Sequence, residues 1–400
     1  MPTTTSDDLM GAARGVLGDV VALRRDLHRH PELGLELTRT QAAVLDAIAP
    51  LPLDVSQGSS LTSVVADLRG AVDGPVVLLR ADMDALPMPE DTGLAFASEI
   101  AGTMHACGHD AHTAMLVGAA RVLADRRDQL DGTVRFMFQP GEEGFHGARS
   151  MIEEGVLENP PVDVAFALHV TPNLPAGMVG TRPGPILASA DVIQIRVTGR
   201  GGHASLPHLA ADPIPVAAEI VTALQSFVTR RIDPFDPAVV TITKIRAGTT
   251  DNVIPEHVDL TGTLRAISDA TRRRALAGIE RVATGIAAAH EMAAEVRVTP
   301  GYPPTVNGLD PVALVERVVR ATLGERCYVE MPSPLMGAED FSYVLAQRPG
   351  ALAFLGVCPP DTDAASAPAC HSNRMTIDED AMAAGVATYA ALAIEALTTA

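Results

Sequence analysis

Cysteine and lysine are scarce in this chain of 400 residues. The four cysteines, Cys107, Cys327, Cys358 and Cys370, are too few and too scattered for a disulfide framework in a chain of this length. Reduced thiols are therefore expected, which leaves Cys107 free to bind a metal. Lysine occurs once, at Lys244, and arginine supplies the other basic residues. We infer no function from this bias toward arginine.

Positive charge and long apolar runs are scarce as well. The formal net charge is -19 and the pI is near 5.0, so a nucleic-acid backbone or an anionic membrane surface would be repelled. Residues 1–18 contain Asp7 and Asp8 and no long apolar run, and no uninterrupted apolar stretch approaches membrane-spanning length. We therefore expect a cytoplasmic protein with no nucleic-acid or membrane partner.

Short, wholly apolar runs alternate with helical segments along much of the chain. A length of 400 residues with 47% hydrophobic content leaves room for two or three domains and a large core. Helical periodicity covers residues 9–30 and 112–126, and the first of these helices ends in His28 and His30, as a helix dipole favours. The apolar runs are typical of strands buried on both faces of a sheet and lie at residues 76–80, 134–138, 164–168 and 351–357. This alternation predicts an α/β fold with a mostly parallel sheet, in which ligands bind beyond the carboxyl ends of the strands.

Residues 104–112 concentrate possible metal ligands. Cys107 and His109, separated by one glycine, can present a thiolate and an imidazole to the same ion from a loop. The alternative is a helix start in which Cys107 is a small core residue and His105 and His112 are caps. Further ligand-like residues follow the apolar runs: Asp82, Asp84, Glu142, Glu143, His169 and His371.

Glu142 and Glu143 are adjacent carboxylates in a tight Pro-Gly turn. Such neighbours repel each other unless cations hold them. Because successive side chains of an extended segment point opposite ways, one glutamate can bind metal while the other faces a substrate. A solvated acidic turn is the alternative, and it applies equally to Asp82 and Asp84.

The pattern changes between residues 186 and 297. Strands are expected at 192–197, 239–245, 257–266 and 295–298, with helices at 213–230 and 270–290. This β-α-β-β-α-β order is ferredoxin-like and predicts an inserted α+β domain. Residues 1–185 and 298–400 would then form one catalytic domain.

The candidate ligands number more than one closed tetrahedral zinc needs, and they suit two metal ions with open positions. The set is Cys107, His109, Glu143, His169 and His371. Such a site with a carboxylate beside it is suited to hydrolysis, because Glu142 can take a proton from water and later hand it to a leaving amine. No G-x-S-x-G motif and no phosphate-binding glycine-rich loop competes with this interpretation.

Seven motifs carry a resemblance that runs through nearly the whole chain: Leu27–Glu32, Arg80–Pro87, His105–Asp110, Gln139–Glu143, Gly202–Ser205, Asn252–Pro255 and Met336–Phe341. The sequence resembles the dinuclear-metal aminoacylases and carboxypeptidases, in the amidohydrolase branch that contains hippurate hydrolases, auxin-conjugate hydrolases and N-acetyl-diaminopimelate deacetylases. The resemblance implies that the five candidate ligands bind metal, with Cys107 as the bridge. It also implies that Glu142 is the general base and that Asp84 orients a ligand. The wider family has His-x-Asp where this chain has Asp82-Met83-Asp84, and His109 looks like the replacement for the absent histidine.

In the inserted domain, the resemblance implies that His203 reaches the active site of the partner subunit in a homodimer and hydrogen-bonds the developing oxyanion. It assigns Asn252 and Arg265 to the free α-carboxylate of the substrate. From the residues alone, His203 is equally well an ordinary loop histidine and Arg265 a solvated strand residue. One local expectation concerns Cys370, whose adjacency to His371 should aim it away from the metals.

We therefore expect a metal-dependent amidohydrolase that cleaves N-acyl-L-amino acids into a carboxylic acid and an amino acid. Its cofactors would be two divalent ions, with zinc first and manganese or cobalt as alternatives. Within the same chemistry, a dipeptidase, a carboxypeptidase or an N-acetyl-diaminopimelate deacetylase is the second interpretation. A metal-binding scaffold without activity is the third, and the retention of Glu142 beside intact ligands argues against it.

Overall fold

The computed structural model describes residues 6–399 and divides into two compact units. Unit 1 comprises the described residues up to Gly184, Val306–Pro332 and the segment from Asp340 onward. Unit 2 comprises Pro185–Thr305 and Ser333–Glu339, so it includes a short segment that the sequence assigned to the catalytic domain. Residues 1–5 and 400 of that predicted domain lie outside the described residues.

Unit 1 contains an eight-stranded mixed sheet within residues 6–399, in the order β1-β2-β4-β3-β5-β16-β6-β15. The strands are β1 (Asp54–Gln57), β2 (Val64–Arg69), β3 (Val72–Asp82), β4 (Asp131–Gln139), β5 (Val164–Thr171), β6 (Val179–Thr181), β15 (Tyr328–Glu330) and β16 (Gly350–Gly356). Strands β4, β3, β5 and β16 run parallel to one another, whereas β1, β2 and β6 pair antiparallel with their neighbours β2, β4 and β16. The four apolar runs correspond to the parallel centre, so their carboxyl ends meet at one edge.

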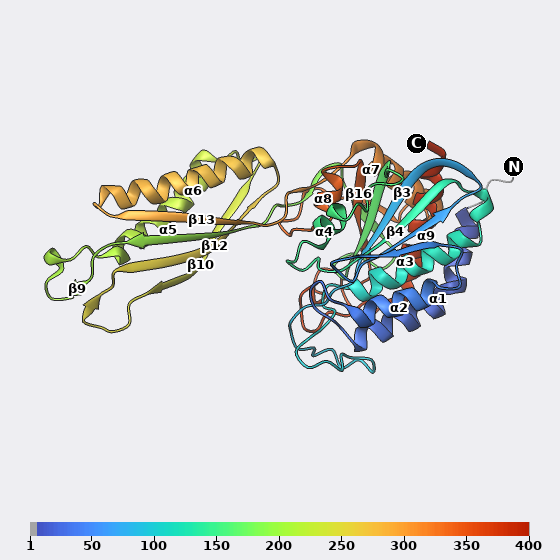
Figure 1. Cartoon of the computed structure of the whole chain (residues 1–400), viewed down its shortest axis with the longest axis horizontal. Coiled ribbons are helices and arrows are strands. Elements are labelled where there is room, and N and C mark those ends of the chain that lie inside the picture. Colours follow the sequence, from blue (N-terminus) through green and yellow to red (C-terminus); the bar gives the residue numbers. More distant parts are fainter. Residues whose placement is uncertain (1–5, 400) are drawn as a thin grey trace. The chain divides into compact units, whose positions relative to one another are not determined.

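Helices cover this sheet and complete the core. They are α1 (Ser6–Arg29), α2 (Thr38–Ile48), α3 (His109–Ala124), α4 (Gly147–Glu153), α7 (Leu309–Leu323), α8 (Ser342–Leu345) and α9 (Met382–Thr399), with short 3₁₀ turns at Arg127–Gln129 and Glu379–Ala381. Helices α3 and α9 pack on β3, α7 packs on β16, and α1 packs over α3 and α9 (Figure 1). By length and composition alone, the segment Glu379–Thr398 is apolar enough to cross a membrane, although charged residues interrupt it. Of its most apolar window, 83% is buried, as expected of a core helix.

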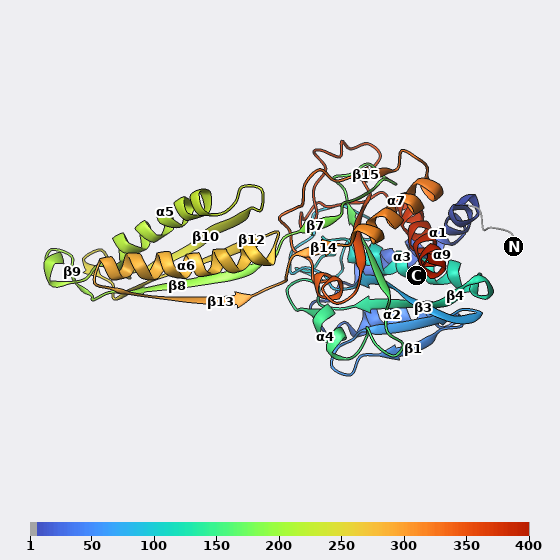
Figure 2. The same cartoon turned by 90° about the horizontal axis from the view of Figure 1, so that it is seen from above.

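Unit 2 is built on a four-stranded antiparallel sheet in the order β10-β12-β8-β13. Its elements are β8 (Asp191–Thr198), β9 (Gly202–His203), a 3₁₀ turn (Pro207–Leu209), α5 (Pro213–Arg231), β10 (Ala238–Ala247), β11 (Val253–Ile254), β12 (His257–Ala266), α6 (Asp269–Ala289) and β13 (Ala293–Pro300). Strands β7 (Gly184–Leu187) and β14 (Thr305–Asn307) lie at the borders of the two units. Helices α5 and α6 lie on one face of the sheet (Figures 1 and 2), and β8 buries every second residue beneath them. The element order β8-α5-β10-β12-α6-β13 is the one that the sequence predicts.

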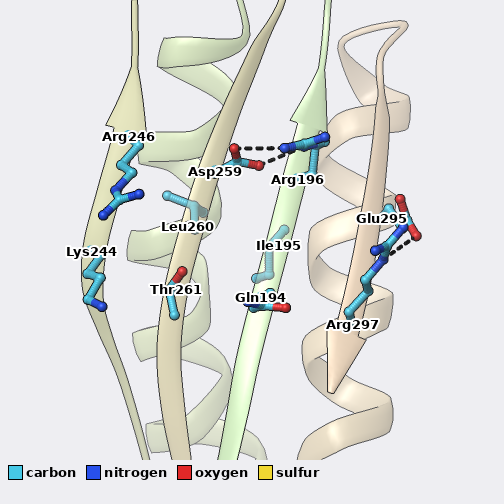
Figure 3. Close-up of a pocket in the computed structure, with 10 residues that line it drawn as sticks. All are labelled: Gln194, Ile195, Arg196, Lys244, Arg246, Asp259, Leu260, Thr261, Glu295 and Arg297. Carbon is cyan, nitrogen blue, oxygen red and sulfur yellow. Dashed lines mark hydrogen bonds and ion pairs between the residues drawn. The ribbon is translucent and has the colours of Figure 1, made fainter. Parts of the chain in front are cut away.

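The opposite face of this sheet is open and charged (Figure 3). Arg196 and Asp259 form an ion pair across β8 and β12 at 2.7 Å, and Arg297 pairs with Glu295 on β13 at the same distance. Exposed pairs of this kind contribute little to stability. The shallow recess here contains none of the predicted site residues, and we interpret it as a solvated sheet face.

Candidate metal centre

A glycine turn brings Cys107 and His109 to the carboxyl end of β5. Gly108 precedes α3 with a φ of 84°, in the left-handed region that favours glycine. A Cβ at this position would lie 2.3 Å from the Val170 side chain, so only glycine allows the loop to approach β5 this closely. The Cys107 Sγ consequently lies 3.3 Å from Nε2 of His169.

The other two candidate ligands complete the cluster. His371 Nε2 lies 3.2 Å from Glu143 Oε1. Ligand atoms lie within 4.8 Å of one another in three overlapping groups, namely Cys107 with His109 and His169, Cys107 with Glu143 and His371, and His109 with Glu142 and Glu143. All five side chains proposed from the sequence therefore converge, and Glu142 lies beside them.

Asp84 fixes the turn that carries both glutamates. Its Oδ1 accepts a hydrogen bond from the Glu142 backbone N–H and its Oδ2 accepts one from the Glu143 N–H, each at 2.9 Å. The same carboxylate lies 3.4 Å from His109 Nδ1. A single buried aspartate thus orients the turn after β4 and contacts the first residue of α3.

The electrostatics of the cluster favour a cation. Burial lowers the pKa of His109, but the carboxylates of Asp82, Asp84 and Glu143 raise it to about 10. Neither ring nitrogen of His109 has a hydrogen-bond partner among residues 6–399, although the ring is 1% exposed. Buried polar atoms normally find partners. Imidazole nitrogens that lie near three carboxylates without a well-formed hydrogen bond to any of them therefore fit divalent metal ions, which prefer imidazole and carboxylate donors.

His112 is a supporting residue that the sequence interpretation left without a role. Its Nδ1 lies 2.6 Å from Asp82 Oδ1, and its Nε2 accepts a hydrogen bond from the Val170 N–H at 2.8 Å. The second bond requires the Nδ1–H tautomer, so both nitrogens are engaged and the ring is not free to bind a metal. The Asp82 carboxylate also accepts from Arg80 at 2.7 Å. The signal for His112 that the sequence offered was its position three residues after His109 on the same helix.

Cys370 departs from its expected orientation. The sequence predicted that it would point away from the centre, but its Sγ lies 3.6 Å from the Val170 carbonyl and its thiol interacts with that of Cys107. This interaction raises the pKa of Cys107 and lowers that of Cys370 to about 6. His371 has a φ of 68°, and this left-handed residue breaks the alternation on which the expectation rested.

The predicted residues of unit 2 fall into two separate places. His203 in β9 pairs with Val253 in β11, and the Ala204 N–H donates to the Asn252 carbonyl at 3.0 Å, so His203 and Asn252 are neighbours. Arg265 lies near the other end of β12, half-buried, where its Nη1 donates to the Met336 carbonyl at 3.4 Å. Strand β12 alone separates the two ends by roughly 26 Å, at about 3.3 Å per residue. Within unit 2 of one chain these side chains do not meet.

A parallel-sheet edge that gathers thiol, imidazole and carboxylate donors around a further carboxylate defines a metal-dependent hydrolase. The profile of peptidase family M20/M25/M40 matches residues 78–395, and the chain belongs to this family.

Similar proteins agree with this classification. The chain is 40% identical to the IAA-amino acid hydrolase ILR1-like 2 of Arabidopsis thaliana over 94% of its own length and 85% of the relative. It is 41% identical to an N-acyl-L-amino acid amidohydrolase of Geobacillus stearothermophilus over 76% of its length and 82% of the relative. The crystal structure of Bacillus subtilis YXEP, a dinuclear metal binding peptidase from the M20 family, matches 97% of this chain and 100% of that one, with a TM-score of 0.84 and 35% identity. The chain is a metal-dependent amidohydrolase with two divalent metal ions.

Proposed function

We propose that this enzyme hydrolyses the amide bond of N-acyl-L-amino acids, as a homodimer with zinc as its metal. The observation that carries the proposal is the Asp84 carboxylate, which holds Glu142 and Glu143 side by side at the ligand cluster. The names of two relatives, an N-acyl-L-amino acid amidohydrolase and an IAA-amino acid hydrolase, support this substrate class. The mixed sulfur, nitrogen and oxygen donors support zinc.

The metal ligands in this proposal are Cys107, His109, Glu143, His169 and His371. When bound, two cations supply Lewis-acid polarisation of the scissile carbonyl and a lowered pKa for water. Asp84 and Asp82 keep the ligand-bearing turns in position, the first through the glutamate backbone and the second through His112. Because ligand-bearing turns held in this way need little rearrangement, the site is preorganised.

Glu142 moves the protons of the reaction. It takes a proton from the attacking water as the carbon–oxygen bond forms, and it delivers that proton to the nitrogen as the carbon–nitrogen bond breaks. The carboxylate is 6% exposed, so it is sheltered from bulk water yet adjacent to the cluster. The products are a carboxylic acid and an amino acid.

His203 donates a hydrogen bond to the developing oxyanion, and Asn252 and Arg265 hold the α-carboxylate of the substrate. Ser205 supports this role, because its backbone N–H donates to His203 Nδ1 at 3.1 Å. A neutral ring that accepts at Nδ1 carries its proton at Nε2, where it is available to an oxyanion. The separation of His203 from Arg265 within one unit supports delivery of His203 and Asn252 by the partner subunit. We place the enzyme in the cytoplasm, where its four free cysteines stay reduced.

Replacing each of the two neighbouring glutamates tests these assignments. We expect Glu142→Ala to lose roughly 10²- to 10⁴-fold in kcat while it retains the metal content of the wild type, because the residue moves protons rather than binding ions. The matched variant Glu143→Ala should lose metal. Turnover of N-acetyl and N-benzoyl amino acids and metal content by mass spectrometry are the measurements. Metal loss in Glu142→Ala with retention in Glu143→Ala would reverse the two roles.

A further inference from the structure

Two of the four cysteines meet at the metal centre although they are far apart in the sequence. The Cys107 Sγ lies 3.3 Å from His169 Nε2, and the thiols of Cys107 and Cys370 are close enough to shift each other's pKa. A backbone hydrogen bond from the His371 N–H to the Ala106 carbonyl, at 2.7 Å, ties the segments that carry them. The Cys370 Sγ also lies 3.6 Å from the Val170 carbonyl, next to His169. Backbone bonding and shared neighbours at the end of β5 therefore bring the two thiols close together.

The remaining two cysteines have no such neighbour. The Cys358 thiol donates to the Thr362 carbonyl at 3.2 Å, and the Cys327 thiol donates to the Leu323 carbonyl at 3.3 Å. Both are local contacts within four residues of the cysteine. Disulfides require thiols whose backbones already lie close together. Of the four described cysteines, Cys107 and Cys370 are the pair whose backbones are tied together, through the adjacent residues Ala106 and His371.

We propose that Cys107 and Cys370 form a redox modification site, in which a peroxide converts the two thiols to a disulfide and thereby displaces metal from the centre. The loss of metal depends on the ligand role proposed above for Cys107, whereas the formation of the disulfide depends only on how close the two thiols lie. A sulfur in a disulfide has no thiolate charge to offer a metal ion. Cross-link and metal binding therefore exclude each other.

The chemistry has two balanced steps. The half-buried Cys370 is more accessible than Cys107, which is 7% exposed, and its thiol attacks the peroxide first, giving a sulfenic acid and water. The Cys107 sulfur then attacks the sulfenic sulfur, so that the sulfur–sulfur bond forms and water leaves. In total the two thiols lose two electrons, and hydrogen peroxide is reduced to two molecules of water. A dithiol reductant reverses the change.

The test treats the full-length enzyme with a short pulse of hydrogen peroxide, with and without prior removal of metal by a chelator. Digestion without reductant by trypsin and then by a protease that cuts at aspartate separates Cys358 from Cys370 at Asp361 and Asp363. We expect a peptide pair linked through Cys107 and Cys370 that dithiothreitol dissolves. The cross-link should form faster in the metal-depleted protein, and the oxidised holoenzyme should release at least one metal ion, measured by mass spectrometry after gel filtration.

Two variants decide the outcome. Cys370→Ser should form no cross-link at Cys107 and should keep its metal through a pulse that strips the wild type. The matched control Cys358→Ser should behave as the wild type does. Absence of the linked peptides from the metal-depleted wild type overturns the proposal, and so does equal metal loss in Cys370→Ser. Cross-linking without metal loss would overturn the ligand role of Cys107, which separates that failure from a failure of the dithiol itself.

Discussion

The hydrogen bonds of Ser205 define the donor position of His203. The His203 Nδ1 accepts from the Ser205 backbone N–H at 3.1 Å and contacts the Ser205 hydroxyl at 2.8 Å. An exposed histidine would otherwise exchange between two tautomers of similar energy. In the proposed mechanism the serine therefore acts through the histidine as a positioning residue, and it need not touch the substrate.

We predict that Ser205→Ala lowers kcat by roughly two- to tenfold, because one neutral hydrogen bond contributes about 0.5–1.5 kcal/mol and the backbone donor remains. Ser205→Thr keeps a hydroxyl and should recover most of the rate. Metal content and KM should change little in either variant. Equal losses in the alanine and threonine variants would mean that the residue supports the loop rather than the tautomer of His203.

At the scale of elements, the end of α1 is joined to the start of α3 by buried charges. His28 Nδ1 lies 2.8 Å from Asp110 Oδ2, and its Nε2 lies 3.2 Å from Glu90 Oε1. Arg24 donates to the same Asp110 oxygen at 2.8 Å. Asp110 is the second residue of α3, directly after His109, so this network holds the helix start that carries a predicted ligand.

The charge of His28 makes this junction dependent on pH. Burial and Arg24 lower the pKa of His28, but Asp110 and Glu90 outweigh them and raise it from 6.5 to about 9. A folded-state pKa above the unfolded value stabilises the protein fully below about pH 6.5 and loses that contribution as pH rises through about 9. A shift of this size corresponds to at most about 3 kcal/mol of unfolding free energy.

We predict that His28→Gln lowers the unfolding free energy at about pH 6 and that its deficit relative to wild type shrinks near pH 10, as measured by urea unfolding at equal metal loading. His290→Gln is the matched control. His290 pairs with Glu219 at 2.8 Å, but both side chains are about half exposed, so solvent screens the pair and the difference should be small at either pH. A deficit for His28→Gln that is independent of pH would show that the ring acts by packing alone.

At the scale of the whole molecule, the residues proposed to surround one substrate belong to separate parts of the chain. Arg265 and the pair formed by His203 and Asn252 lie at opposite ends of the sheet in unit 2. That sheet has β10 and β13 as its edge strands, and pairing of edges across a two-fold axis is a common way to protect them. The proposed homodimer, formed through unit 2, would account for both observations.

Mixing two inactive variants tests this assembly. We predict that His203→Ala and Glu142→Ala homodimers are each nearly inactive, since loss of an oxyanion donor costs about a hundredfold or more. After subunit exchange, mixed dimers hold one site with both groups, so activity should recover to about a quarter of wild type. Failure to recover, once exchange is verified by mass, would place His203 in the site of its own subunit or outside catalysis.

Much of the fold and most of the cluster could be predicted because their signals are local. Four buried strands were visible as apolar runs, and unit 2 as a change in periodicity with a known element order. Asp84, Glu142 and Glu143 were visible as polar residues directly after such strands, where parallel topology brings residues together. The α/β fold and the amidohydrolase class were predicted correctly.

Tertiary structure alone decided which atoms of this cluster touch. The backbone bonds of Asp84 and the double engagement of His112 depend on contacts between segments that no local pattern records. The orientation of Cys370 depends on the left-handed backbone at His371, because a single positive φ reverses the side that a neighbouring side chain faces. Side-chain direction in a loop follows from dihedral angles that long-range packing selects, so spacing along the chain does not determine it.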